Sequence, residues 1–91
     1  MPGTITSGMD VQAVRAMAQE LTRAGQEIQQ LTQRITALVT NAPWVGPDYA
    51  RFTGDWNGRQ AALLRQVATS LTDAGRIATQ NAQDQEATSG R

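Results

Sequence analysis

The ionisable side chains of this sequence offer little chemistry for catalysis. The 91 residues include no His and no Cys, so the side chain best suited to proton transfer near neutral pH and the reactive thiolate are both absent. The same absence removes the usual nitrogen and sulfur ligands of a metal ion. The acidic residues are spread along positions expected to face water, where they make the chain soluble: Asp10, Glu20, Glu27, Asp48, Asp55, Asp73, Asp84 and Glu86. The sequence therefore predicts no enzyme activity, no cofactor and no metal site.

Charge and hydropathy argue against two further classes of partner. Eight basic residues balance eight acidic ones, so the chain lacks the electrostatic footprint expected of a protein that binds nucleic acid. No uninterrupted apolar run reaches the roughly 18 residues of a bilayer-spanning helix, so membrane insertion is not expected. The first residues show neither a basic start nor an apolar run of signal-peptide length, so export through a cleaved leader is not expected either.

A helical repeat of apolar residues runs through the first half of the chain. Asp10 is the expected N-cap, and Ser7 offers a capping arrangement one turn earlier. Pro43 biases Ala42 away from helical angles, so the helix is expected over residues 10–41. Its apolar steps alternate between three and four, a spacing that keeps one seam facing a partner helix, as in a coiled coil: Val14, Met17, Leu21, Ala24, Ile28, Leu31, Ile35 and Leu38.

Smaller residues broaden this seam on one side. Val11, Ala18, Gly25 and Val39 widen it toward the apolar face of an ordinary bundle helix. A single facing helix would not cover a stripe of this width. Glycine weakens a helix relative to Ala, so Gly25 indicates either a close helix approach or a glycine that is merely tolerated.

A turn and a second helix are expected to follow. Gly46 before Pro47 indicates a helix start, because Pro suits the first helical position, and Asp48 complements the positive end of the helix dipole. The turn is expected over residues 42–47 and the second helix over about 47–85, with residues 87–91 frayed. The apolar stripe of this helix comprises Tyr49, Phe52, Trp56, Leu63, Val67, Leu71, Ala74 and Ala78, with Leu64 and Ile77 alongside.

Two long helices joined by a short turn predict an all-α, antiparallel helix-turn-helix hairpin. It is expected to fill residues 1–91 as one domain with flexible termini. The turn is assigned to Trp44-Val45-Gly46 and not to Trp56-Asn57-Gly58, because neither Pro nor a turn cluster surrounds the second motif. Every aromatic residue lies at or just after the turn, which predicts a bulky cap at one end of the rod: Trp44, Tyr49, Phe52 and Trp56.

Association is expected because a rod of two helices buries little apolar surface. Burying one Leu or Ile contributes roughly 1.5–3 kcal/mol, whereas ordering each residue costs roughly 1.5 kcal/mol. With about two seam residues in seven, the balance for a lone hairpin is near zero or unfavourable, so a dimer is predicted. The residues expected at the hairpin or dimer interface are Val14, Met17, Leu21, Ile28, Leu31, Ile35, Leu38, Phe52, Trp56, Leu63, Val67 and Leu71.

The Trp44-Val45-Gly46 turn between two amphipathic helices resembles the WXG-motif family of small type VII secretion substrates of actinobacteria. The resemblance continues through residues 47–52 and Trp56, and the polar stretch 81–86 is similar to the helix end of such members. It implies a hairpin that pairs with itself or with a relative into a four-helix bundle. It also implies export by a membrane ATPase apparatus without a cleaved leader. Trp44 and Gly46 are then recognition residues for that apparatus or a partner, while the residues alone also allow Trp44 to be a staple that packs the turn onto both helices.

The sequence departs from this family at one element. Export there is linked to Tyr-x-x-x-Asp or Glu just after the second helix, but Gln80 stands four residues before Asp84, and Ala82 four before Glu86. The only Tyr is Tyr49. We expect a partner chain to supply the export signal, so the dimer is predicted to be secreted. Without such a partner, the chain is predicted to be cytoplasmic. The alternative is a cytosolic adaptor or chaperone hairpin that pairs with a larger toxin or effector and is not itself exported; a plain oligomerisation module is the third reading.

Overall fold

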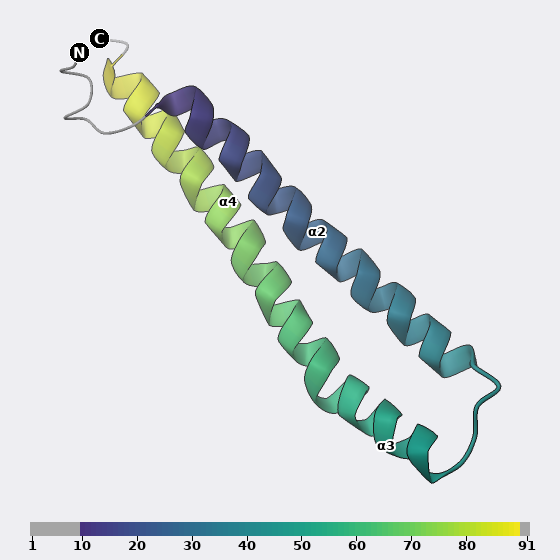
Figure 1. Cartoon of the computed structure of the whole chain (residues 1–91). Helices are drawn as coiled ribbons and strands as arrows, with labels where there is room; N and C mark the ends of the chain where they lie inside the picture. Colours follow the sequence, from purple (N-terminus) through teal and green to yellow (C-terminus); the bar gives the residue numbers. More distant parts are fainter. Residues whose placement is uncertain (1–9, 90–91) are drawn as a thin grey trace.

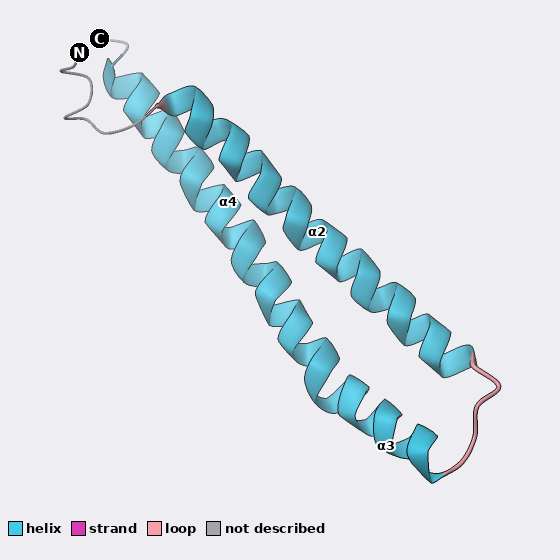
Figure 2. Cartoon of the chain, viewed as in Figure 1, coloured by secondary structure: helices cyan, strands magenta, loops and turns pink. Residues whose placement is uncertain are grey.

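The computed structural model describes residues 10–89 and shows an antiparallel helical hairpin (Figure 1). Helix α2 spans Val11–Asn41, and the second arm is one joined rod of α3 (Pro47–Asp55), the π-helical turn η1 (Trp56–Gln60) and α4 (Ala61–Ser89). The described residues contain helices and connecting loops without a strand (Figure 2). With extents of 65 × 18 × 17 Å, the molecule is a rod two helices wide. The all-α hairpin predicted from the sequence is confirmed.

Local signals place both ends of α2. The carboxylate of Asp10 accepts a hydrogen bond from the Ala13 amide at 3.1 Å, as expected of an N-cap, whereas Ser7 lies outside the described residues. At the other end, Ala42 has φ −69° and ψ 140°, the extended conformation favoured before a proline. The helix therefore ends at Asn41, because Pro43 favours an extended conformation at Ala42.

The connection between the arms depends on one glycine. Gly46 has φ 117°, a left-handed conformation that a residue with a side chain adopts only under strain. Pro47 follows at the first helical position, and the Ala50 amide donates to the carbonyl of Gly46 at 3.1 Å. The bend thus lies at Trp44-Val45-Gly46, and Trp56-Asn57-Gly58 lies inside the second arm, as the sequence predicted.

The two arms touch along a line of small residues. Within α2 and α4 the buried positions are spaced by seven residues: Ala18, Gly25 and Thr32 in α2, and Ala61, Ala68, Gly75 and Ala82 in α4. We call this set the contact line. A Cβ built on Gly25 would lie 2.8 Å from the carbonyl oxygen of Ala68, and one on Gly75 would lie 2.8 Å from that of Ala18. The close approach suggested by Gly25 is therefore confirmed.

The contact line, and not the large apolar seam of α2, makes the closest contact between the arms. Small side chains let the backbones approach, and at that distance bulky residues fit only at the flanks of the contact. Met17, Leu31 and Leu38 of the expected seam are 47–65% exposed, whereas Ala18 beside it is 1% exposed. The seam, predicted for the hairpin or dimer interface, thus runs along one side of the two arms.

The second arm extends further than its composition indicated. Helix α4 continues to Ser89, beyond the expected end near residue 85, and residues 87–89 are helical instead of frayed. Arg15 of α2 forms an ion pair with Glu86, and the Thr88 hydroxyl donates to the Asp84 carbonyl oxygen at 2.9 Å. These contacts support the last turns. Residues 90–91 lie outside the described part of the chain.

Candidate interaction surface

One side of the hairpin carries most of its large aliphatic residues. In α2 some of them lie four residues before a position of the seven-residue repeat that defines the contact line: Val14, Leu21, Ile28 and Ile35. Others lie one residue before such a position: Met17, Leu31 and Leu38. In α4, Leu64 and Leu71 lie four residues before Ala68 and Gly75, and Val67 lies one before Ala68. Two antiparallel helices that share one contact line are related by an approximate twofold axis perpendicular to the plane of the pair. Residues at the same distance in sequence from the contact line therefore lie on the same side of the hairpin in α2 and in α4.

We call this side the open face and include Leu63 and Ile77, which border it on α4. Its outer members are left in solvent: Leu38 is 65% exposed, Leu63 54%, Ile77 51%, Met17 50%, and Leu31 and Val67 47% each. Its inner members are half-buried where the two arms meet: Val14, Leu21, Ile28, Ile35, Leu64 and Leu71. A contiguous apolar surface of this kind typically marks a site of protein association.

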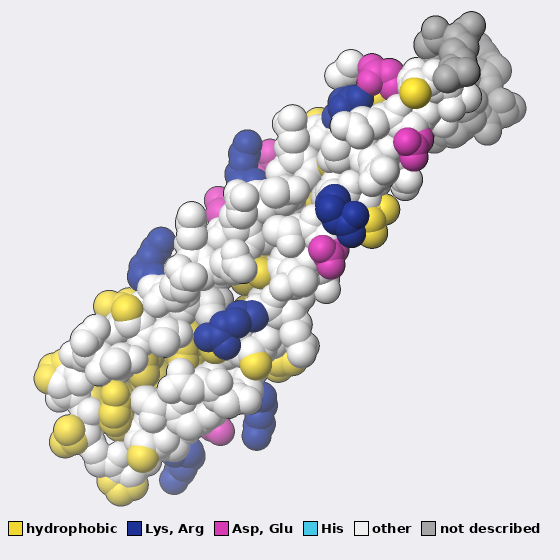
Figure 3. Space-filling view, turned by 180° about the vertical axis from the view of Figure 1, so that it is seen from behind, with side chains coloured by type: hydrophobic (Ala, Val, Ile, Leu, Met, Phe, Trp, Pro, Cys, Tyr) yellow, Lys and Arg dark blue, Asp and Glu magenta, His cyan; other side chains and the backbone are white. Residues whose placement is uncertain are grey.

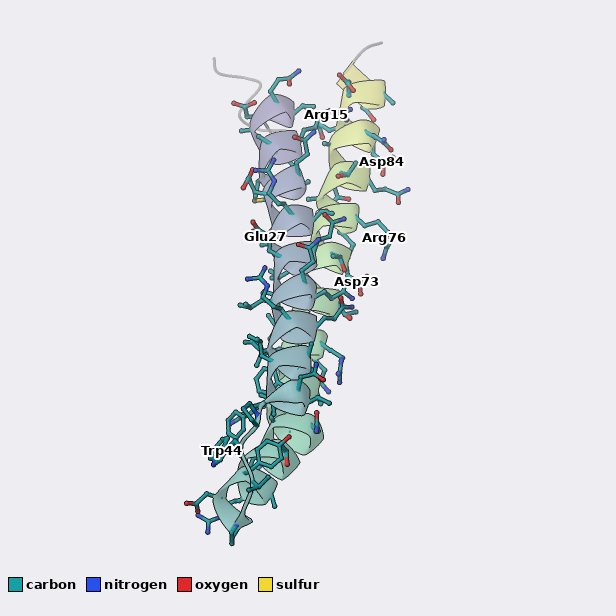
Figure 4. The ribbon with its side chains drawn as sticks, turned by 90° about the vertical axis from the view of Figure 1, so that its right-hand side faces the viewer. Arg15, Glu27, Trp44, Asp73, Arg76 and Asp84 are labelled. Carbon is teal, nitrogen blue, oxygen red and sulfur yellow. The ribbon has the colours of Figure 1, made fainter. Side chains whose placement is uncertain are left out.

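The opposite side is polar. Four residues after each contact-line position lie Thr22, Gln29 and Thr36 in α2, and Arg65, Thr72, Thr79 and Glu86 in α4. Figure 3 views this side and shows charged side chains scattered along the rod, with hydrophobic side chains gathered mainly at the turn end. Arg15 and Arg76 point to one side of the rod in Figure 4, and Trp44 lies on the other. The hairpin is therefore amphipathic across its width.

The turn end carries the aromatic cap that the sequence predicted. The Trp44 ring meets Tyr49 edge-on with centroids 5.4 Å apart, and it lies 6.1 Å from the Phe52 ring. Such pairs contribute about 0.5–1.5 kcal/mol beyond the area they bury. Trp44 nevertheless remains 47% exposed and Val45 84% exposed. The cap therefore both packs the turn and presents apolar surface to solvent.

Two hydrogen bonds tie this cap to α2. The Tyr49 hydroxyl donates to the Val39 carbonyl oxygen at 2.8 Å, near the C-terminus of α2, where that carbonyl also accepts from the Ala42 amide at 3.4 Å. The Trp56 indole N–H donates to the Thr36 hydroxyl oxygen at 2.8 Å, and Trp56 is 7% exposed. Of the residues predicted at the interface, Trp56 is the one that the hairpin itself buries.

The remaining predicted interface residues divide between two environments. Val14, Leu21, Ile28, Ile35 and Leu71 are half-buried at the inner edge of the open face. Met17, Leu31, Leu38, Phe52, Leu63 and Val67 are exposed. Of the predicted recognition pair, Trp44 lies in the cap and Gly46 in the turn next to it.

The described residues provide surfaces for contact along the open face and at the cap. No three potential metal-binding side chains among them gather into a site. A shallow hollow near the turn is lined by Arg34, Ala37, Leu38, Asn41, Ala42 and Pro43. It adjoins the open face at Leu38. None of the described helices is both long and apolar enough to cross a lipid bilayer.

Sequence reasoning missed two features of this site. The contact line was visible as Ala61, Ala68, Gly75 and Ala82, which repeat every seven residues, but the larger side chains of the seam took precedence. The π-turn η1 had a weaker signal, the polar gap in the stripe between Trp56 and Leu63.

Comparisons with protein-family models, with curated proteins and with solved structures find no match to this chain.

Proposed function

We propose that this chain is a non-enzymatic protein linked to type VII secretion, and that it works as a dimer in which a second hairpin covers the open face. The observation that carries the proposal is the open face itself, an apolar surface along an antiparallel hairpin whose bend is Trp44-Val45-Gly46. Export by the type VII ATPase apparatus, without a cleaved leader, is the expected fate of the dimer.

The exposure of the open face supports association. Leu31, Leu38 and Leu63 each leave about half or more of their surface in water. Fully burying one such side chain contributes roughly 1.5–3 kcal/mol, and several lie on both arms. The contact line meanwhile buries mainly Ala and Gly, which provide little apolar area. A partner on the open face therefore contributes the larger share of hydrophobic burial.

The shape and charge of the hairpin support a partner of the same kind. A rod of 65 × 18 × 17 Å with one apolar side is matched over its length by another rod with one apolar side. The formal charge of +0 means that two copies have no net repulsion to overcome. Either a second copy or a related hairpin fits this description.

One observation favours the alternative of a cytosolic adaptor or chaperone hairpin for a larger toxin or effector. The positions where a Tyr would complete the export element are Gln80 and Ala82. In that case the open face holds the effector, and the hairpin remains in the cell.

Secretion from the native cell, measured together with complex mass, tests the proposal. The chain produced alone is expected to stay inside, and co-production of a second hairpin protein is expected to send both to the medium. Leu31→Glu, on the open face, should dissociate the dimer and stop export, whereas Gln30→Glu introduces the same charge at an exposed neighbour and should do neither. A wild-type hairpin that stays monomeric at micromolar concentration with the second hairpin present, or one retained whatever hairpin is co-produced, would overturn it.

A further inference from the structure

The π-turn η1 decides which residues of the second arm face α2. The Ala61 amide donates to the carbonyl oxygen of Trp56, five residues back, so this turn holds one residue more than an α-helical turn. One extra residue rotates the preceding segment by about 100° relative to α4. As a result, Trp56 is buried and Tyr49 and Thr53 are half-buried, while Gly54 is exposed.

The seven-residue spacing of small residues continues past the π-turn, but the small residue beyond the turn no longer faces α2. Counting back by sevens along the contact line from Gly75 through Ala68 and Ala61 leads to Gly54. In an uninterrupted α-helix Gly54 would lie on the contact line, where the chain already uses glycine at Gly75. In this structure a Cβ built on Gly54 would meet nothing within 4 Å.

We propose that the segment α3 switches between two registers. In the π register, seen here, the extra residue sits in η1 and Trp56 faces α2. In the α register, the extra residue passes into the turn at 42–46, Gly54 joins the contact line, and Trp56 turns outward. The displacement along the arm is one residue, about 1.5 Å, which a non-helical connection can absorb.

The two registers exchange one set of contacts for another. The π register keeps the hydrogen bonds from Trp56 to Thr36 and from Tyr49 to Val39, each 2.8 Å long. The α register gives up both, replaces the π-type bonds of η1 by α-helical ones, and extends the close backbone contact toward the turn. The ribbons of α2 and α3 diverge at that end in Figure 1.

The switch changes what the turn end presents to a partner. In the α register the Trp56 indole joins Trp44, which is already 47% exposed, in solvent. A partner that binds the aromatic end would select this register, since a ligand shifts an equilibrium toward the state it binds better. The inference concerns the lone chain and holds whether or not the protein is exported.

Fluorine NMR of the full chain tests the switch, with 5-fluorotryptophan at Trp56 as the single reporter in a Trp44→Phe background. Thr36→Val removes the acceptor of the indole N–H and should shift the ratio of registers roughly twofold to tenfold toward a solvent-exposed signal. Adding Gly54→Leu should abolish that signal, because Leu fits the open space of the π register and not the contact line.

Two results would overturn the proposal. One is a single, unbroadened Trp56 signal in Thr36→Val protein whose circular dichroism is that of an intact helix. The other is an exposed signal that survives Gly54→Leu, which would indicate local unfolding in place of a register change. Should Thr36→Val fail to fold, relaxation dispersion at Trp56 in the Trp44→Phe chain serves instead: exchange present there and absent after Gly54→Leu supports the switch, and exchange that is absent or unchanged refutes it.

Discussion

Gly25 of α2 and Ala68 of α4 meet backbone to backbone. A Cβ at Gly25 would lie 2.8 Å from the Ala68 carbonyl oxygen and 2.7 Å from the methyl carbon of Thr72. A carbonyl oxygen within a helix cannot move aside as the end of a side chain can. A glycine in each arm therefore allows the two backbones to come this close, since a Cβ on Gly75 of α4 would likewise lie 2.8 Å from the Ala18 carbonyl oxygen of α2.

Gly25→Ala is expected to destabilise the hairpin, by about 1–3 kcal/mol from overpacking. The direction of the stability change is informative, because Ala stabilises a helix interior relative to Gly by roughly 0.5–1 kcal/mol when nothing obstructs its methyl group. Gly54→Ala is the matched control: it is helical, exposed and free of atoms within 4 Å of a new Cβ, so it should stabilise. Urea unfolding of both variants measures the difference, and stabilisation by both would refute the close contact.

Deletion of Gly58 should remove the π-turn while keeping the aromatic residues in place. The shortened turn becomes α-helical, and Trp56 and Tyr49 still face α2 because the surplus residue is gone. Loss of a glycine from the helix should raise stability by roughly 0.5–1 kcal/mol. Deletion of Ser70, an exposed residue inside α4, instead rotates one half of the contact line away from α2 and should unfold the hairpin. Thermal unfolding distinguishes the two, and equal loss of structure would contradict this account of η1.

Tyr49→Phe removes one hydrogen bond between the arms and leaves the ring contact with Trp44. We expect a loss of roughly 0.5–1.5 kcal/mol in the free energy of unfolding, the net value of a hydrogen bond. Thr40→Val removes a hydroxyl that donates only within α2, to the Thr36 carbonyl oxygen at 2.7 Å, and should change stability less. Chemical denaturation of the two variants provides the comparison; a Thr40→Val loss as large as that of Tyr49→Phe would count against the cap.

Trp44→Ala separates the structural role of this residue from a recognition role. Because Trp44 is 47% exposed and its ring contacts are with Tyr49 and Phe52 of α3, helicity and dimer mass should be retained while export falls. Val45→Ala, at a side chain 84% exposed, controls for a general effect of shortening a turn residue. Circular dichroism, sedimentation and secretion from the native cell are the measurements. Loss of folding would assign Trp44 the staple role alone.

The sequence by itself determined the helices and the place of the bend. Asp10, Pro43, Gly46 and Pro47 act on the backbone within a residue or two of themselves, so caps and turn geometry are local and readable. Two helices with one short turn then leave the antiparallel hairpin as the remaining arrangement. The end of α4 was predicted too early because the ion pair between Arg15 and Glu86 joins residues 71 positions apart.

Only the tertiary structure decided which side of each helix faces the other. Hydrophobicity ranks Leu31 above Ala18 and Gly25, but the distance between two backbones is set by the smallest side chains along their contact. The large residues of the seam were therefore displaced to the open face. The π-turn has the same origin: the aromatic residues near the bend and the small residues of α4 are out of phase by one position, and a single continuous α-helix cannot turn both toward α2.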